Sequence, residues 1–324
     1  MIKVGIVGYG NLGRGVALAV NNACDMDCVG IFTRRDPKTL NPVVDFPVYH
    51  MSDLKDFKGQ IDVLLVCGGS ATDLPIITAE LLKDFNTVDS FDTHAKIPEY
   101  FDKLDKVAKE NGTLGAISIG WDPGLFSIAR MFFGAVLPNG LDYTFWGKGV
   151  SQGHSDAIRR IKGVKNAIQY TIPNENALES VRCGLNPTLT TRDKHLRECY
   201  VVIEDEQDKD RIENEIKTMP NYFADYDTIV HFVSEEELKE NHSKLSHGGF
   251  VMRSGNTTSD NKHLLELSIK LDSNPEFTGS VLTSYARAVA RLAKEGKKGA
   301  LTVFDIPIKY LSPLSEEELR AHII

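Results

Sequence analysis

Short apolar runs alternate with stretches of helical periodicity over about the first 120 residues of this 324-residue chain. Buried parallel strands are continuous apolar runs, whereas a helix that packs on a sheet repeats its apolar residues every three or four positions. The alternation predicts an α/β fold of the Rossmann type, a doubly wound parallel sheet. The predicted strands span residues 2–7, 27–32, 62–67, 87–92 and 114–119, and the predicted helices span 12–20, 75–85 and 98–111.

The pattern changes after Trp121, where apolar and polar residues alternate along the predicted strands. Such alternation is typical of half-buried antiparallel strands with one exposed sheet face. We therefore predict a dinucleotide-binding domain over residues 1–121 and a mixed α+β domain for substrate binding and dimerisation over 122–274. The strands predicted in this second domain span 143–146, 167–172, 198–203, 228–233 and 263–271.

The last fifty residues contain one long Ala-rich segment of helical periodicity, residues 278–295, and a short apolar run over 300–306. Gly296 follows the periodic segment, as expected where a helix ends. We predict a helix and a final strand here. The segment from about 275 to 324 is expected to return to the first domain.

A glycine-rich turn follows the first predicted strand directly and opens the first predicted helix. Its residues are Gly8, Tyr9, Gly10, Asn11, Leu12 and Gly13. In a Rossmann unit the first glycine allows the tight bend, the second lets a pyrophosphate approach the backbone, and the third lets the helix pack on the strand. Free N–H groups and the helix dipole then favour the anion. The turn predicts dinucleotide binding; the alternative is a glycine-rich bend without a ligand.

The end of the second predicted strand indicates which dinucleotide binds. NAD-dependent enzymes place an acidic residue here for the ribose 2′-hydroxyl, whereas NADP requires space and positive charge for a 2′-phosphate. This chain has Thr33, Arg34 and Arg35, which are all hydrogen-bond donors suited to a phosphate. The sequence therefore predicts NADP. The alternative is a solvated arginine pair in a surface loop.

Two aspartates follow successive predicted strands, Asp92 after one and Asp122 after the next. Open parallel sheets bind ligands at the carboxyl ends of their strands, so both carboxylates are expected at the ligand edge, near a cationic substrate group. The alternative for each is a local role in a turn or helix cap. A second glycine turn, residues 68–72, is also expected to face the cofactor. The predicted cofactor contacts are Gly8, Tyr9, Gly10, Asn11, Leu12, Gly13, Thr33, Arg34, Arg35, Gly69, Ser70, Ala71, Thr72, Asp92, Thr93, His94, Asp122, Pro123, Gly124, Leu125 and Phe126.

Composition narrows the class of partner to small molecules. A net charge of −8 and a pI near 5.6 argue against a nucleic-acid binder, which needs clustered Lys and Arg. The five cysteines include no Cys-x-x-Cys pair, and His242 and His247 lack the spacing of a helical zinc pair, so we predict neither disulfides nor a metal. Neither a signal peptide nor a membrane span is expected, which favours the cytoplasm.

Five segments are more specific than the glycine turn alone. They are Gly8-Tyr9-Gly10-Asn11-Leu12-Gly13-Arg14, Gly120-Trp121-Asp122-Pro123-Gly124, Phe145-Trp146-Gly147, Ser151-Gln152-Gly153-His154-Ser155-Asp156-Ala157 and His247-Gly248-Gly249. Together they resemble the NADP-dependent meso-diaminopimelate D-dehydrogenase family, and the resemblance runs from the first residue to the last predicted strand. It implies reversible oxidation of the D-centre of meso-2,6-diaminopimelate to L-2-amino-6-oxopimelate, ammonia and NADPH, in lysine and diaminopimelate biosynthesis.

The same resemblance implies roles for single residues. It places Asp92 and Asp122 beside the reacting D-centre, and Trp146, Gln152 and Gly153 along the substrate chain. The distal L-centre would then be held by Thr171, Arg197, His247 and Asn274. A guanidinium matches a carboxylate in a bidentate way, so Arg197 is the expected carboxylate clamp. From the residues alone, Arg197 would be a strand-surface arginine and His247 a loop histidine.

The implied chemistry is hydride transfer from the D-centre Cα to the nicotinamide, followed by hydrolysis of the imine. Asp122 or Asp92 would accept a proton from the ammonium group or only position it, and the sequence leaves this choice open. Two other functions also stay open. One is a different NADP-dependent amino-acid or semialdehyde dehydrogenase or reductase, and the other is a non-catalytic NADP-sensing protein. The expected assembly is a homodimer.

Overall fold

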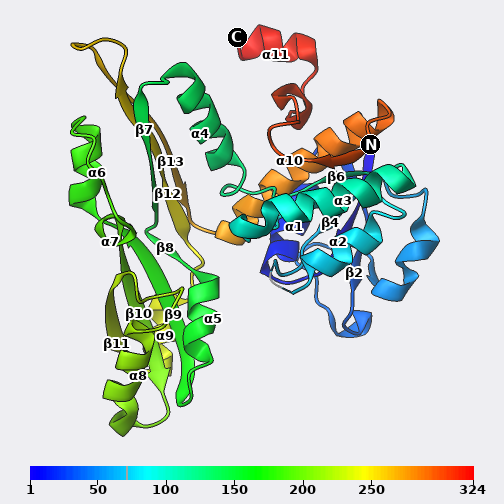
Figure 1. The fold of residues 1–324 in the computed structure, drawn as a ribbon. Coiled ribbons are helices and arrows are strands. Elements are labelled where there is room, and N and C mark those ends of the chain that lie inside the picture. The colour runs from blue at the N-terminus through cyan, green and yellow to red at the C-terminus, as the bar shows by residue number, and fades with distance from the viewer. Residues whose placement is uncertain (71) are drawn as a thin grey trace. The chain divides into compact units, whose positions relative to one another are not determined.

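The computed structural model describes residues 1–70 and 72–324 of the chain (Figure 1). Two compact units make up this described part. The first comprises Met1–Ile128 together with Pro275–Ile324, and the second comprises Ala129–Asn274. The expected boundary at residue 121 thus lies a few residues before the division made by the contacts, because the start of helix α4 (Leu125–Val136) packs with the first unit.

The first unit is built on a sheet in which, within the described residues, all seven strands are parallel. The strand order β14-β6-β5-β4-β1-β2-β3 reverses direction at β1, which is the Rossmann arrangement. The predicted fold class is confirmed. The strands are β1 (Ile2–Val7), β2 (Met26–Thr33), β3 (Val48–His50), β4 (Val63–Val66), β5 (Thr87–Asp89), β6 (Leu114–Ala116) and β14 (Gly299–Leu301).

Helices cover both faces of this sheet because successive residues of each strand point to opposite sides. Val4 and Ile6 of β1 pack with α1 (Asn11–Asn21) and α10 (Asn274–Lys294), drawn in blue and orange in Figure 1. Val7 faces the other way, into a cluster with α2 (Leu74–Leu81) and α3 (Ile97–Asn111). Helix α11 (Glu316–His322) and short 3₁₀ segments at Pro37–Thr39, Met51–Phe57, His94–Lys96 and Ile308–Leu311 complete the unit.

Three strands of this sheet end at least three residues before their predicted ends. β5 ends at Asp89 and β6 at Ala116, where the chain leaves the sheet and a buried carboxylate takes the place of further ladder bonds. β14 ends at Leu301 because Thr302 donates both its N–H and its hydroxyl to Asp305 and turns the chain. The predicted residues 302–306 are therefore not strand.

The second unit contains two sheets. One has the order β11-β10-β9-β8 and the other the order β13-β12-β7. β9 and β10 are antiparallel, as predicted, but β10 and β11 are parallel because α8 (Lys209–Lys217) returns the chain between them. The strands are β7 (Gly140–Trp146), β8 (Gly149–Val150), β9 (Val164–Pro173), β10 (His195–Ile203), β11 (Asp227–Phe232), β12 (His247–Asn256) and β13 (Lys262–Leu271).

Helices pack on these sheets, and the four-stranded sheet has helices on both of its faces, α5 (Gln152–Arg159) and α8 on one and α9 (Glu235–His242) on the other. α5 and α8 pack on Ala167, Cys199 and Val201, and α6 (Glu175–Arg182) packs on β7 and β12. A further helix, α7 (Thr191–Lys194), flanks the four-stranded sheet. No helix among the described residues is long and apolar enough to cross a membrane.

Candidate functional site

The glycine turn after β1 has the geometry that a dinucleotide phosphate requires. Gly8 adopts φ +89°, a conformation that favours glycine, and Gly10 is the N-cap of α1 without any side-chain cap. The first turn of α1 contains no acidic residue. Its N–H groups and the positive end of its dipole are therefore directed at an anion site.

The other two glycines of the turn differ in the space around them. A Cβ on Gly13 would lie 2.3 Å from the carbonyl oxygen of Gly8, so the helix packs directly on the turn. A Cβ on Gly10 would meet no atom within 4 Å, which leaves open space above the backbone. This is the division of roles expected when a pyrophosphate crosses the second glycine. The residues present fit a dinucleotide.

The two arginines after β2 have different partners. Arg34 forms an ion pair with Asp73 at 2.9 Å, whereas the guanidinium of Arg35 donates to the carbonyl oxygen of Tyr9. Arg35 also lines a cavity of about 230 Å³ together with Tyr9, Arg14, Thr39, Leu40 and Asn41. The side chain of Thr33 accepts the N–H of Arg35 at 3.1 Å and is almost fully buried, so it shapes the turn.

Arg14 was not among the residues predicted from the sequence. It lies on the first turn of α1, and its guanidinium shares the cavity with Arg35, so two positive charges and no carboxylate line this space. The signal was present in the sequence, since Arg14 directly follows the third glycine. Thr39 and Asn41 were also missed, because they reach the cavity from the loop after β2.

The loop after β4 lies beside the loop after β5. The hydroxyl of Ser70 accepts the N–H of Asp92 at 3.1 Å, and the N–H of Gly69 donates to Asp73 at 3.2 Å. Of the predicted contacts in these two loops, Ser70 and Asp92 are thus joined directly. Ala71 lies outside the described residues.

Asp122 follows β6, the neighbour of β5 in the sheet. The turn from Gly120 to Gly124 is closed by a bridge between Trp121 and Gly124, and the N–H of Phe126 donates to Trp121 at 2.8 Å. Asp122 is half-buried on this turn, whereas Asp92 is exposed. Since β5 and β6 are parallel neighbours, both carboxylates follow strands that end at the same edge of the sheet, as predicted from the sequence.

In the second unit, Arg197 is buried with only 6% of its surface exposed. It donates to the hydroxyl of Thr171, its partner across β9 and β10, and its guanidinium stacks 3.9 Å from the ring centre of Tyr226. Its Nε has no hydrogen-bond partner among the described residues. Because a buried donor without a partner is costly, this geometry is suited to an anionic ligand and excludes a strand-surface role for Arg197.

Trp146, at the end of β7, is fixed by a histidine that the sequence did not single out. The backbone N–H of Trp146 donates to Nε2 of His195 at 2.9 Å, and the two rings stack with their centres 5.3 Å apart. Burial, with a smaller contribution from Arg197, lowers the pKa of His195 to about 3. His195 is therefore neutral at pH 7, with the lone pair that accepts the Trp146 N–H.

The remaining predicted substrate residues belong to the same part of the second unit. Gln152 and Gly153 begin α5 and are exposed. The backbone of Gly149, which pairs with Thr171, packs directly against His247. The N–H of Asn274 donates to the carbonyl of Leu245, two residues before His247. These contacts bring Thr171, Arg197 and His247 together around β8 and β9.

Gln169 is a further polar residue that the sequence did not predict as functional. It is fully buried, lies on the same face of β9 as Thr171, and has no hydrogen-bond partner for either side-chain amide atom among the described residues. The hydroxyl of Thr228 also has no hydrogen-bond partner among the described residues, and Thr228 lies opposite Arg197 in the pairing of β10 and β11. Strand alternation could have placed Gln169 beside Thr171, but it could not have shown that this face is covered.

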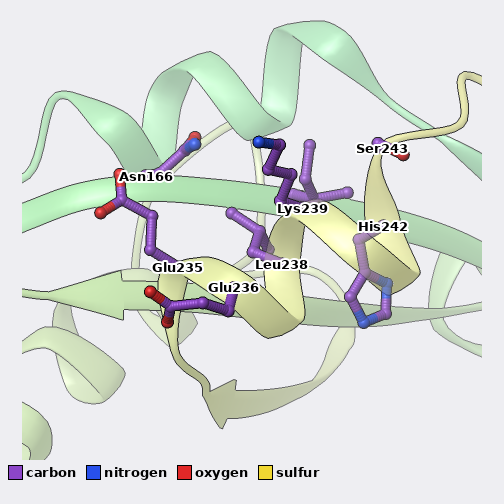
Figure 2. A pocket seen from close by; sticks show the side chains of 8 residues that line it. Asn166, Glu235, Glu236, Leu238, Lys239, His242 and Ser243 are labelled. Atoms are coloured by element: carbon purple, nitrogen blue, oxygen red, sulfur yellow. The ribbon is translucent and has the colours of Figure 1, made fainter.

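Figure 2 shows a groove of about 550 Å³ between α9 and β9, on the opposite face of the sheet from Thr171. It is lined by Asn166, Ile168, Glu235, Glu236, Leu238, Lys239, His242 and Ser243, and none of the predicted residues. Two carboxylates against one ammonium group do not favour a ligand with two carboxylates. The candidate site is therefore the face that carries Arg197.

Comparisons with known proteins agree with these motifs. Residues 120–273 match the family model described as the diaminopimelic acid dehydrogenase C-terminal domain. The meso-diaminopimelate D-dehydrogenase of Ureibacillus thermosphaericus is 58% identical over 323 residues, which covers 100% of this chain and 99% of that protein. The chain belongs to the meso-diaminopimelate D-dehydrogenase family. The family's member from Corynebacterium glutamicum is 44% identical over 99% of this chain and 98% of that protein.

Solved structures of the diaminopimelate dehydrogenase family share the fold over the whole chain. The diaminopimelate dehydrogenase of Corynebacterium glutamicum in complex with diaminopimelate has a TM-score of 0.93 at 42% identity, covering 100% of this chain and 99% of that one. A substituted enzyme from Clostridium tetani with diaminopimelate has a TM-score of 0.95 at 53% identity and covers both chains fully. An engineered D-amino acid dehydrogenase bound to NADP⁺ has a TM-score of 0.88 at 41% identity, covering 100% of this chain and 99% of that one.

Proposed function

We propose that this chain oxidises the D-centre of meso-2,6-diaminopimelate with NADP⁺ and water, giving L-2-amino-6-oxopimelate, ammonia and NADPH, and that it also catalyses the reverse reaction. The observation that carries the proposal is the full-length identity of 58% to an enzyme of that name. The chemistry of the side chains supports it, because a substrate with two ammonium and two carboxylate groups needs both acceptors and donors. This chain has carboxylates in the first unit and a buried guanidinium in the second.

The cofactor would be held by the glycine turn and by the arginine-lined cavity. The N–H groups at the start of α1 would receive the pyrophosphate, and Arg14 and Arg35 are the cations best placed for the 2′-phosphate, because Arg34 already pairs with Asp73. Thr33, Arg34 and Arg35 offer no carboxylate to a ribose 2′-hydroxyl, and the next residue, Asp36, accepts the N–H of Lys38 as the N-cap of the short 3₁₀ segment. This donor set supports NADP over NAD.

The distal L-centre would be held in the second unit by Thr171, Arg197, His247 and Asn274. The Clostridium tetani structure carries substitutions at a glutamine, a threonine, an arginine, a proline, a histidine and an asparagine. The same intervals in this chain fall on Gln152, Thr171, Arg197, Ser246, His247 and Asn274, and all but Ser246 match in residue type. This correspondence supports the assignment of those residues to the substrate pocket.

When bound, the nicotinamide would accept the hydride from the D-centre Cα. The amine must be neutral for the hydride to leave, so a base has to take one proton from the ammonium group. Asp122 is the better candidate, because it is half-buried on a closed turn, whereas Asp92 is exposed and is suited to holding the ammonium group. Loss of the hydride from the D-centre would leave an imine. Water would then attack the imine carbon, and ammonia would leave as the keto group forms.

A substrate and cofactor panel tests this proposal. Formation of NADPH or NADH is followed by absorbance with the meso, LL and DD forms of diaminopimelate, each with NADP⁺ and with NAD⁺. We expect turnover with the meso form and NADP⁺, little or none with the LL form, and slower turnover with NAD⁺. Absence of turnover with every form would refute the proposed function, and equal turnover with the LL form would refute the assignment of the D-centre.

The role of Asp122 is tested by Asp122→Asn, which keeps the shape of the side chain and removes the base. We expect kcat to fall by about 10²- to 10⁴-fold, the range of general acid–base catalysis, while the Kd for NADPH changes little. Fluorescence titration of NADPH provides the second measurement. Unchanged turnover would remove Asp122 from the mechanism.

Homodimerisation and a cytoplasmic location stay predictions from the sequence, testable by sedimentation and fractionation.

A further inference from the structure

Asp89, at the end of β5, is a fully buried carboxylate that the proposed reaction does not use. Its Oδ2 accepts the hydroxyl of Tyr100 at 2.6 Å, and its Oδ1 accepts the N–H of Phe91 at 3.0 Å and the N–H of Ser118 at 3.2 Å. All three donors are buried. No lysine, arginine or histidine forms an ion pair with it among the described residues.

The two backbone donors belong to the two loops that carry the proposed catalytic carboxylates. Phe91 directly precedes Asp92, and Ser118 begins the segment that leads through Gly120 to Asp122. A single oxygen atom of Asp89 thus joins both loops. The carbonyl of Asp89 adds a third link, since it accepts the N–H of Ile119 at 2.9 Å.

The segment after β6 needs such an anchor because it leaves the sheet abruptly. Ser118 adopts φ +57°, a left-handed conformation that a residue with a side chain rarely adopts without support. The hydrogen bond from its N–H to Asp89 holds it there. Without an acceptor, the buried N–H groups of Phe91 and Ser118 would have to find water, and both loops would shift.

Packing alone does not require a carboxylate at this position. Burial raises the pKa of Asp89, and the Tyr100 hydroxyl opposes that shift only in part. An apolar residue of similar size would avoid the desolvation of the carboxyl group. It would, however, leave the buried N–H groups of Phe91 and Ser118 without an acceptor, and a buried donor that loses its partner is costly. The acceptor atoms are therefore the property of Asp89 that the fold uses here.

We propose that Asp89 is a positioning residue that fixes Asp92 and Asp122 relative to each other through hydrogen bonds to the backbones of their two loops. This inference rests on the proposed roles of Asp92 and Asp122. The amine of the substrate must lie between them, and misplacement of a reacting group by about 1 Å can lower a rate on the order of a hundredfold.

The test compares three variants of the same buried cluster. Asp89→Ala removes the acceptor for both loops, and we expect kcat to fall by about 100-fold. Tyr100→Phe is the matched control, because it removes the hydrogen bond to Oδ2 and leaves both loop contacts intact; kcat should stay within about threefold of wild type, the scale of one lost contact away from the reacting atoms. Asp89→Asn keeps an acceptor oxygen for both N–H groups, and should recover most of the activity lost in Asp89→Ala.

Hydrogen–deuterium exchange supplies a readout that does not depend on turnover. Amides over residues 90–93 and 117–122 should exchange faster in Asp89→Ala than in Tyr100→Phe, measured at matched distance from each thermal midpoint. If Asp89→Ala does not fold, Asp89→Ser takes its place, since its hydroxyl can reach the N–H two residues on but not that of Ser118. Faster exchange in Asp89→Ser should then be confined to 117–122.

Each outcome favours or overturns the inference. A kcat loss no larger in Asp89→Ala than in Tyr100→Phe, or equal exchange in the two variants, overturns it. Asp122→Asn, measured in the same panel, separates the two proposals: a loss there without a loss in Asp89→Ala refutes only the positioning role, whereas full activity of Asp122→Asn refutes the proposed role of Asp122. If wild type does not turn over diaminopimelate, equal exchange in the variants still overturns the inference.

Discussion

Gly10 and Gly13 lie three residues apart in the glycine turn after β1, yet the structure predicts different effects when each is replaced by alanine. A Cβ on Gly10 would meet no atom within 4 Å, so the fold should tolerate it. A Cβ on Gly13 would lie 2.3 Å from the carbonyl oxygen of Gly8, far inside van der Waals contact, and backbone must move. The first change therefore tests the ligand and the second tests the fold.

The magnitudes follow from these contacts. The Cβ in Gly10→Ala would occupy the space that a pyrophosphate needs, and loss of one charge-assisted hydrogen bond costs about 1.5–3 kcal/mol, or about 10- to 150-fold in Kd. The thermal midpoint should stay within about 2 °C of wild type, since the only cost to the fold is that alanine is a poorer N-cap than glycine. Gly13→Ala forces overpacking, which costs about 1–3 kcal/mol and lowers the midpoint by several degrees in a domain of this size.

The assay is a titration of NADPH by its fluorescence together with thermal unfolding of the free protein. Gly10→Ala should lose affinity without losing stability, and Gly13→Ala should lose both. NADPH binding to Gly10→Ala with wild-type affinity would falsify the path of the pyrophosphate over this glycine. A large stability loss in Gly10→Ala would show that the open space is needed by the fold.

Two further predictions concern charge. In Arg35→Ala the KM for NADP⁺ should rise by about 10- to 150-fold, whereas the KM for NAD⁺ should stay unchanged. Arg34→Ala should have a smaller effect on the KM for NADP⁺, because Arg34 already pairs with Asp73. Equal rises for both cofactors in Arg35→Ala would count against the 2′-phosphate site. Because burial lowers the pKa of His195 to about 3, this histidine is neutral in the fold, whereas in the unfolded chain it gains a proton below about pH 6.5. Stability is therefore full above that pH and falls as pH decreases from 6.5 towards 3, by about 1.4 kcal/mol per unit from this group. Urea unfolding between pH 7 and 4.5 should show a shallower slope for His195→Gln, and equal slopes would refute the argument.

The first unit could be predicted from the sequence in most of its detail, because its signals are local. Each strand is a short apolar run, and the glycine turn encodes a backbone shape within six residues. What the sequence overestimated was strand length: β5 and β6 end where Asp89 replaces ladder hydrogen bonds, and those partners lie about 30 residues apart. The Arg34–Asp73 ion pair could not be predicted either, because it joins two loops that are distant in the sequence.

The second unit was harder to predict, and β12 shows the reason. Most of its residues are buried whichever face they point to, so it lacks the alternation that identified β7, β9 and β13, and its three glycines leave only a short apolar run. The parallel pairing of β10 and β11 depends on the path of α8, which strand periodicity does not report. Local patterns give the presence of a strand, but its neighbours are determined by the connections.

Arg197 shows why the substrate side of the site was visible only through family resemblance. Along β10 it occupies an ordinary alternating position, and an arginine there is normally a solvated side chain. Its guanidinium stacks on Tyr226, a residue distant in the sequence, and α5 and α8 cover Cys199 and Val201 on the same face of the sheet. The glycine turn would bind through backbone groups, so the sequence of the turn itself is enough to predict it. The proposed substrate pocket depends on side chains from four strands and from the first turns of α5 and α10, so the local sequence does not reveal it before the sheets are assembled and covered.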